Sequence, residues 1–268
     1  MNAFFDTHAH LDYSDYTPDL PEVIARAQAA GISKIISIGT TLESSRRAIR
    51  LAEQNPCVYA AVGWHPTDAL TAPEDLRPAL RELARHPKVV AIGETGLDYF
   101  RPPSSAGGSA EDDVRYKKRQ VEIFQQQLEV AAELGLNCVI HQRASFDDTL
   151  AQLKPFAGKV RGVFHCFGET VERLEQILAI GSLVSFTGIV TFKNSQNVRD
   201  AVAATPVGKF MLETDCPYLA PVPYRGKRCE PAFVKEISEE VAQVKQCSLA
   251  ELSAATGRTA QDFFPKIW

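Results

Sequence analysis

Short apolar runs alternate with longer amphipathic segments along nearly the whole chain. Most runs are rich in β-branched or aromatic residues, and turn-forming residues separate them from the helical segments, as is typical of β-strands. The runs predict eight strands, at residues 3–6, 34–38, 58–62, 89–93, 137–140, 161–164, 182–186 and 210–213. The amphipathic segments predict helices at residues 18–30, 43–54, 73–85, 115–134, 146–153, 171–179, 195–204 and 231–245, with a smaller helical tail at the end.

Eight strands that are each followed by a helix predict an α/β fold, a (β/α)8 TIM barrel. An open doubly wound sheet is the alternative, but candidate ligands on strands one, four, five, six and eight would converge better in a closed barrel. No internal repeat or linker interrupts the chain, so we expect one domain over residues 1–268. Residues 101–113 (RPPSSAGGSAEDD) differ in composition and predict a long loop, either a surface insertion or a mobile flap over the site.

The composition narrows the possible partners. With 45% hydrophobic and 23% charged residues the chain resembles an ordinary globular protein. Its formal net charge of −4 offers no general attraction to nucleic acid or anionic membranes, so a phosphate-bearing substrate needs local cations or bound metal. We find no leader segment, no apolar run of membrane-spanning length and no CxxC pair among the six cysteines, and we expect a reduced, cytoplasmic protein, favouring a monomer.

Potential metal ligands follow five of the predicted strands. They are His8, His10, Glu94, His141, His165 and Asp215. A parallel barrel gathers the carboxyl ends of its strands at one face, so these side chains are expected to converge there. His8 and His10 are two residues apart and point to the same side of an extended chain. Glu213 and Asp215 are also two residues apart, so both side chains are expected on the same side of the chain, with Glu213 deeper. The sequence alone does not decide which of these two carboxylates is the ligand.

The donor set indicates hydrolytic chemistry. Imidazoles and carboxylates without thiolates suit Zn, Mn, Co, Fe or Mg. A carboxylate such as Glu94 can bridge two divalent cations, and Asp215 can accept a proton from the attacking water. Because a cation lowers the pKa of bound water to about 7, hydrolysis without a covalent enzyme intermediate is expected.

Six stretches of the sequence resemble the TatD family of metal-dependent deoxyribonucleases, within the amidohydrolase superfamily. They are FFDTHAHLD at 4–12, AVGWHPTDA at 61–69, AIGETGLDYF at 91–100, VIHQRA at 139–144, GVFHCF at 162–167 and MLETDCPYLAP at 211–221. The resemblance spans essentially the whole chain and implies a somewhat distorted TIM barrel with two metal cations. The first cation would take His8, His10, Glu94 and Asp215, and the second would take Glu94, His141 and His165.

The resemblance also implies substrate contacts. His65 would help to bind a phosphate or an additional metal. Arg143 is either a phosphate contact, because its planar fork matches phosphate oxygens, or the partner of a neighbouring helix. Tyr218 and Arg225 belong to a loop that mixes aromatic and basic residues, which suits a single-stranded end but also a solvated surface. The family's usual second histidine after His-Pro is Thr67 here, a departure that concerns substrate choice and not the metal ligands.

Three functions follow as alternatives. The first is a metal-dependent deoxyribonuclease that removes nucleotides from the 3′ end of single-stranded DNA. The second is hydrolysis of an amide or ester, such as a lactone or an aminoacyl bond, by the same activated water. The third, non-catalytic nucleic-acid binding, is disfavoured by the complete ligand set and the acidic pI.

Overall fold

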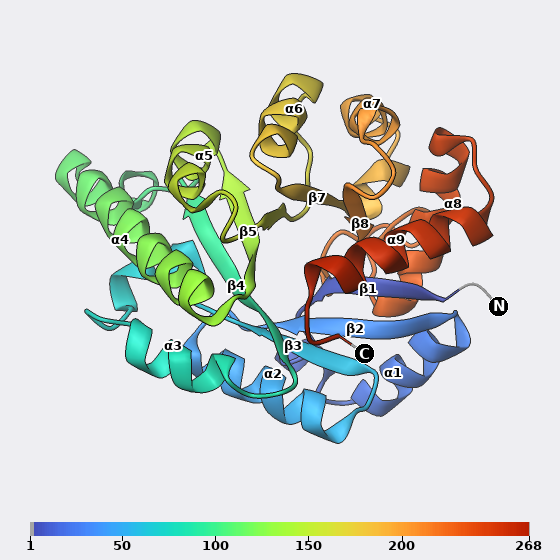
Figure 1. Cartoon of the computed structure of the whole chain (residues 1–268), viewed down its shortest axis with the longest axis horizontal. Helices are drawn as coiled ribbons and strands as arrows, with labels where there is room; N and C mark the ends of the chain where they lie inside the picture. Colours follow the sequence, from blue (N-terminus) through green and yellow to red (C-terminus); the bar gives the residue numbers. More distant parts are fainter. Residues whose placement is uncertain (1–2, 268) are drawn as a thin grey trace.

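Eight parallel strands hydrogen-bond in sequence order and curve into a barrel that helices surround (Figure 1). The computed structural model describes residues 3–267. The strands are β1 Phe4–Ala9, β2 Ile32–Ile38, β3 Val58–Val62, β4 Val89–Asp98, β5 Asn137–Arg143, β6 Gly162–Phe164, β7 Leu183–Phe186 and β8 Phe210–Leu212. β8 and β1 share no ladder in the described residues, but the chain after β8 pairs with the end of β1 through an isolated bridge between Ala9 and Cys216, so the barrel is nearly closed. The predicted TIM barrel is confirmed.

Helices follow each strand. They are α1 Leu20–Ala29, α2 Leu42–Gln54, α3 Arg77–Ala84, α4 Ala110–Leu134, α5 Phe146–Leu153, α6 Val171–Ala179, α7 Gln196–Ala204, α8 Val234–Lys245 and α9 Leu249–Phe263, with short 3-10 turns η1 Ser14–Tyr16, η2 Pro66–Thr71, η3 Pro103–Ala106, η4 Lys154–Phe156, η5 Gly188–Thr191 and η6 Pro231–Phe233. Within residues 3–267, none of these helices combines the length and the apolar character that a bilayer crossing requires.

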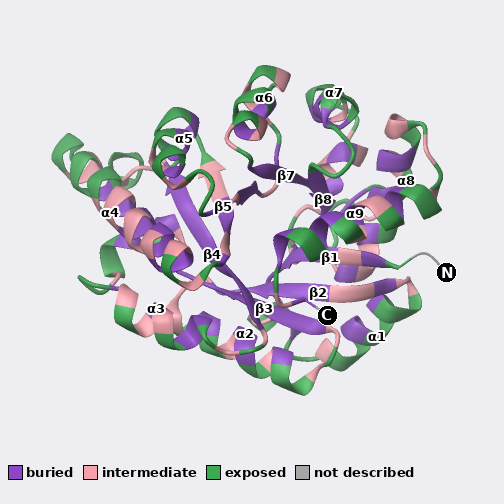
Figure 2. Ribbon diagram, viewed as in Figure 1, coloured by how far each residue is buried: buried purple, intermediate pink, exposed green. Residues whose placement is uncertain are grey.

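The strands are buried on both faces, as Figure 2 shows. Alternate residues face two separate apolar layers because side chains of a strand alternate with period two. In β2, Ile35 belongs to the layer under the helices, whereas Ile36 and Ile38 belong to the barrel interior. A fully buried side chain of this size contributes about 1.5–3 kcal/mol, so the two layers together hold the barrel.

The last helix closes one end of the barrel interior. Phe263, Phe264 and Ile267 pack with the interior residues of the strands, at the amino ends of the strands. The Asn137 side chain, at the start of β5, donates a hydrogen bond to the Phe263 carbonyl at 2.6 Å. The carboxyl ends of the strands are therefore the open end, where the predicted ligands lie.

Several predicted boundaries were wrong. The helix predicted at 115–134 begins at Ala110, because Ser109 and Asp112 form a capping box that satisfies the first backbone N–H groups. The Ser104 hydroxyl also donates to Asp113 at 2.6 Å, so the expected long loop is shorter and anchored to α4. β4 and β5 extend to Asp98 and Arg143, and Glu94 and His141 therefore lie within strands and not after them. The flap hypothesis stays a prediction.

Candidate metal centre

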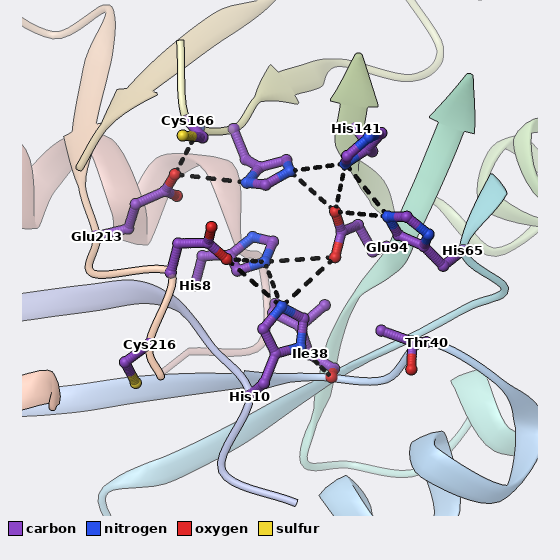
Figure 3. A network of polar contacts seen from close by, with 12 residues as sticks. His8, His10, Ile38, Thr40, His65, Glu94, His141, Cys166, Glu213 and Cys216 are labelled. Atoms are coloured by element: carbon purple, nitrogen blue, oxygen red, sulfur yellow. Dashed lines mark hydrogen bonds and ion pairs between the residues drawn. The ribbon is translucent and has the colours of Figure 1, made fainter. Parts of the chain in front are cut away.

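The six predicted ligands converge at the carboxyl ends of the strands, around Glu94. Figure 3 labels four of them, namely His8, His10, Glu94 and His141. His8 lies in β1 and His10 directly after it, Glu94 comes from β4, and His141 comes from β5. His165 directly follows β6, and Asp215 lies in the loop after β8. The two carboxylate oxygens of Glu94 face two different groups of side chains.

The first group consists of His8, His10, Asp215 and the Glu94 Oε2 atom. The Nε2 atoms of His8 and His10 are 3.3 Å apart, and they lie 3.4 and 3.7 Å from Glu94 Oε2. Asp215 Oδ1 lies 3.6 Å from His8 Nε2 and 3.5 Å from His10 Nε2. The ligand atoms of His8, His10 and Glu94 lie close enough together to hold one cation, and Asp215 lies beside both histidines. Imidazole and carboxylate donors of this kind suit a divalent cation in their chemistry.

The second group surrounds Glu94 Oε1. His141 Nδ1 lies 2.8 Å from this oxygen and His165 Nε2 lies 2.9 Å from it. The two imidazole nitrogens are 3.2 Å apart. His65 Nε2 is also close, at 3.4 Å from Glu94 Oε1 and 3.2 Å from His141 Nδ1. Two imidazole nitrogens and a carboxylate oxygen suit a second cation in their chemistry, and His65, Glu94 and His141 lie close enough together to hold one.

The structure separates the two carboxylates that sequence left as alternatives. Glu213 is 1% exposed and lies behind His165. It accepts hydrogen bonds from the Cys166 backbone N–H and the Ser185 hydroxyl, both at 2.6 Å. Its Oε1 atom lies 3.7 Å from His165 Nδ1, whereas the other ring nitrogen of His165, Nε2, faces Glu94. Asp215 is the carboxylate that joins the first group.

The charges of the site are mutually dependent. Burial alone would raise the pKa of Glu94, but the imidazoles of His165, His65 and His8 hold it well below its usual value. Burial would likewise lower the pKa of His165, but Glu94 and Glu213 hold it well above its usual value. Burial would raise the pKa of Asp215, which the neighbouring histidines, His10 foremost, keep below its usual value. In the metal-free protein the carboxylates are therefore ionised and paired with His165, and a cation would have to displace the imidazole proton to bind there.

Local packing explains why these strands place their side chains so closely. Gly96 has a φ of +136°, and a Cβ atom there would lie 2.0 Å from the His141 carbonyl oxygen. Only glycine therefore permits β4 and β5 to run side by side at this point. Asp6 of β1 accepts hydrogen bonds from the backbone N–H and the hydroxyl of Thr214, at 2.9 and 2.6 Å, and this tie positions the loop that carries Asp215.

Sequence reasoning missed Asp6. Its signal resembled that of Glu94, a carboxylate within an apolar strand, where burial requires strong hydrogen-bond donors. Burial raises the pKa of Asp6 to about 8.

A cavity of about 670 Å³ lies above the donor groups. Three of the four predicted substrate residues line it, namely His65, Arg143 and Tyr218. The Arg143 guanidinium lies over the exposed ring of Phe100, 3.7 Å from its centroid. Tyr218 is 53% exposed at the rim.

The fourth predicted substrate residue, Arg225, lies outside the lining of this cavity. Its guanidinium lies over Phe192, 3.6 Å from the ring centroid. Arg228, in the same loop, forms two hydrogen bonds of 2.8 Å to Asp19. The basic loop is therefore partly committed to structural contacts.

Comparison with known proteins agrees with this geometry. A sequence model of the TatD-related DNase family matches residues 5–265. The chain belongs to this family. It is 38% identical over 261 residues to a protein of Bacillus subtilis (strain 168) named "Uncharacterized metal-dependent hydrolase YabD", covering 97% of this chain and 98% of that one. It is 34% identical over 266 residues to "3'-5' ssDNA/RNA exonuclease TatD" of Citrobacter rodentium, covering 97% of each.

A solved structure of a TatD homologue supports the same conclusion. The YJJV protein of Escherichia coli K12 superposes with a TM-score of 0.88 at 26% identity, covering 98% of both chains. The predicted resemblance is confirmed, and the chain is a metal-dependent hydrolase of the TatD-related DNase family.

Proposed function

We propose that this TatD-family protein is a phosphodiesterase that removes nucleotides from the 3′ end of single-stranded DNA. The observation that carries the proposal is the pair of donor groups that share Glu94 at the floor of one cavity. Two cations spaced by one carboxylate suit the in-line displacement at phosphorus. The name of the Citrobacter rodentium relative supports the same reaction.

In the proposed reaction His8, His10, Glu94 and Asp215 would hold one cation, and Glu94, His141 and His165 would hold the other. The cations, when bound, lower the pKa of the attacking water and neutralise charge on the phosphoryl oxygens. Asp215 lines the cavity beside His8 and His10, where its carboxylate would accept the proton of the attacking water. Glu94 contributes both oxygens and fixes the spacing of the two groups.

His65 and Arg143 orient the substrate phosphate in this proposal. Thr67 donates its backbone N–H to His65 Nδ1 at 3.2 Å, which leaves Nε2 facing the cavity floor. Arg143 presents its guanidinium at the cavity wall, held by the Phe100 ring. Tyr218 and Tyr13 line the same cavity with their rings 6.4 Å apart, and an unpaired base can stack on them.

The proposal extends to the setting of the enzyme. We propose Mg, Mn, Zn, Co or Fe as the cations, a monomeric single-domain enzyme, and a cytoplasmic location. The six cysteines, all within the described residues, are free thiols, which suits a reducing compartment.

The test is a cleavage assay on labelled oligonucleotides. Metal-loaded protein should shorten a 5′-labelled single strand one nucleotide at a time from its 3′ end, act poorly on a blunt duplex, and lose activity in chelator. Asp215→Asn should abolish cleavage, whereas Asp200→Asn, the same change on the exposed face of α7, should not. An oligonucleotide that stays uncleaved while lactones or aminoacyl esters are hydrolysed rapidly would refute the proposal and favour ester hydrolysis.

A further inference from the structure

Asp98, the last residue of β4, contacts a proposed metal ligand but belongs to neither donor group. It is 6% exposed and lines the cavity wall. Its Oδ2 atom lies 3.1 Å from His141 Nε2, and its Oδ1 atom accepts the Phe100 backbone N–H at 2.8 Å. Both oxygens of this carboxylate are therefore occupied by neighbouring donors.

Both nitrogens of the His141 ring face carboxylates, Nε2 facing Asp98 and Nδ1 facing Glu94. A carboxylate only accepts hydrogen bonds, so Nε2 carries hydrogen toward Asp98, and a cation bound at Nδ1 would take the place of any hydrogen there. His141 then keeps Nε2–H toward Asp98 and presents the Nδ1 lone pair to the second group. The opposite tautomer would place hydrogen on Nδ1, where it could donate to Glu94 Oε1 at 2.8 Å but could not bind a cation.

We propose that Asp98 is a positioning residue that fixes the tautomer and ring orientation of His141 for binding the second cation. The inference rests on the proposed function, because it takes His141 as a ligand. Carboxylate partners of this kind orient metal-bound imidazoles in many proteins, and their loss weakens metal binding by about 10- to 100-fold.

Asp98 is itself held in place by α4. The buried carboxamide of Gln120 accepts the Asp98 backbone N–H and donates to the Asp98 carbonyl, both at 2.8 Å. Because both backbone groups are bound, the carboxylate stays fixed where β4 gives way to the loop at 99–109. Gln120 therefore acts on His141 through Asp98.

The other proposed ligands have weaker partners on their outer nitrogens. His165 Nδ1 lies 3.7 Å from Glu213, and among residues 3–267 the buried His8 Nδ1 has no hydrogen-bond partner. The His10 Nδ1 contact with the Ile38 carbonyl is long, at 3.4 Å. Removing Asp98 should therefore weaken the second cation selectively and leave the first in place.

The experiment measures zinc binding by competition with a chromophoric chelator. Wild type should bind two cations. In Asp98→Ala one of them should bind about 10- to 100-fold more weakly while the other is unchanged. Asp98→Asn should lose less, because its amide oxygen still accepts from His141. This isosteric variant also provides the readout should the alanine variant fail to fold.

Two glutamine variants provide a matched comparison. Gln126, on the same helix, binds the Leu76 N–H and the Glu74 carbonyl at 2.7 and 2.9 Å, a similar pair of bonds that holds the segment before α3 instead of a neighbour of a ligand. Gln120→Ala should weaken the second cation, and Gln126→Ala should not, although both lower the melting temperature.

Imidazole ¹⁵N NMR of the zinc-loaded wild type reads the tautomer directly, and His141 should carry hydrogen on Nε2. Hydrogen on Nδ1 would overturn this inference but not the proposed function. The same holds if Asp98→Ala binds both cations with affinities within threefold of those of wild type. Wild type that takes up no zinc would overturn the proposed function as well. Wild type that binds two cations, loses one in Asp98→Ala and cleaves no oligonucleotide would support the inference while refuting the proposed substrate.

Discussion

Replacing Glu94 with glutamine tests the proposed centre at its most connected residue. Glu94 is 2% exposed, and its two oxygens lie within 3.4 Å of nitrogens from His8, His65, His141 and His165. The substitution keeps the shape of the side chain but removes its charge. We expect the loss of both proposed cations, because each donor group loses its anionic member.

The magnitude follows from burial. Removing one partner of a buried ion pair costs about 3–5 kcal/mol. At about 1.4 kcal/mol for each factor of ten, cation binding should weaken by about two to nearly four orders of magnitude. When the metal concentration is limiting, the turnover rate should fall by at least the same factor as the cation affinity.

The pH dependence gives the prediction a second signature. Glu94 and Glu213 hold the pKa of His165 well above its usual value in the metal-free protein. A raised histidine pKa contributes stability that is complete below the unfolded pKa and is lost as pH rises through the folded pKa. Without metal, Glu94→Gln should therefore be most destabilised near pH 5 and approach wild type at alkaline pH. With metal bound to wild type, the gap should persist at alkaline pH.

Two measurements check these expectations. Chelator competition gives the cation affinities, and urea unfolding from pH 5 to 10, with and without metal, gives the free energy of unfolding. Glu129→Gln, the same change in a half-buried pair with Arg77 away from the site, is the matched control; it should leave the cation affinities unchanged, and its effect on unfolding should not depend on metal. If Glu94→Gln binds both cations with affinities within tenfold of those of wild type, the proposed bridging role is refuted.

Three further predictions concern the site and the fold. His141→Ala should lower kcat by orders of magnitude while circular dichroism shows a folded protein; turnover near wild type in metal-replete buffer would exclude the proposed ligand role. Burial raises the pKa of Asp6 from 3.8 to about 8, so its protonated form stabilises the metal-free fold below pH 4 and this contribution is lost as pH rises from about 4 to 8; Asp6→Asn should therefore gain stability relative to wild type between pH 4 and 8 in urea unfolding and keep a constant difference above pH 8, and a difference that is constant from pH 4 to 8 would contradict the assignment. Ser109→Ala removes the cap of α4 and should cost about 0.5–2 kcal/mol in the same assay with kcat unchanged, and an unchanged unfolding midpoint would show that the cap is dispensable.

The order of strands and helices follows from sequence because it depends on local periodicity. Apolar runs with turn residues between them predicted all eight strands, and four histidines and two acids after apolar runs predicted which side chains converge. Helix ends were less predictable: α4 begins at Ala110 because a serine and an aspartate happen to cap it, and such caps compete with the loop-forming tendency of the same residues. A barrel then places the strand ends together without further information.

Other features depended on contacts between distant segments. Because strand side chains alternate with a period of two residues, Glu213 and Asp215 are expected on the same side of the chain. Only the position of β8 in the barrel decides that Asp215 reaches His8 whereas Glu213 accepts from the Cys166 N–H. The contact of Asp98 with His141 requires β4 and β5 to pair in one register, and the Gln120 bonds require α4 to pack across that strand. Closure of the barrel by Phe263 and Phe264 likewise joins the end of the chain to every strand. Sequence patterns report which side chains a strand can present, whereas the distance between two side chains on different strands is set by register and packing.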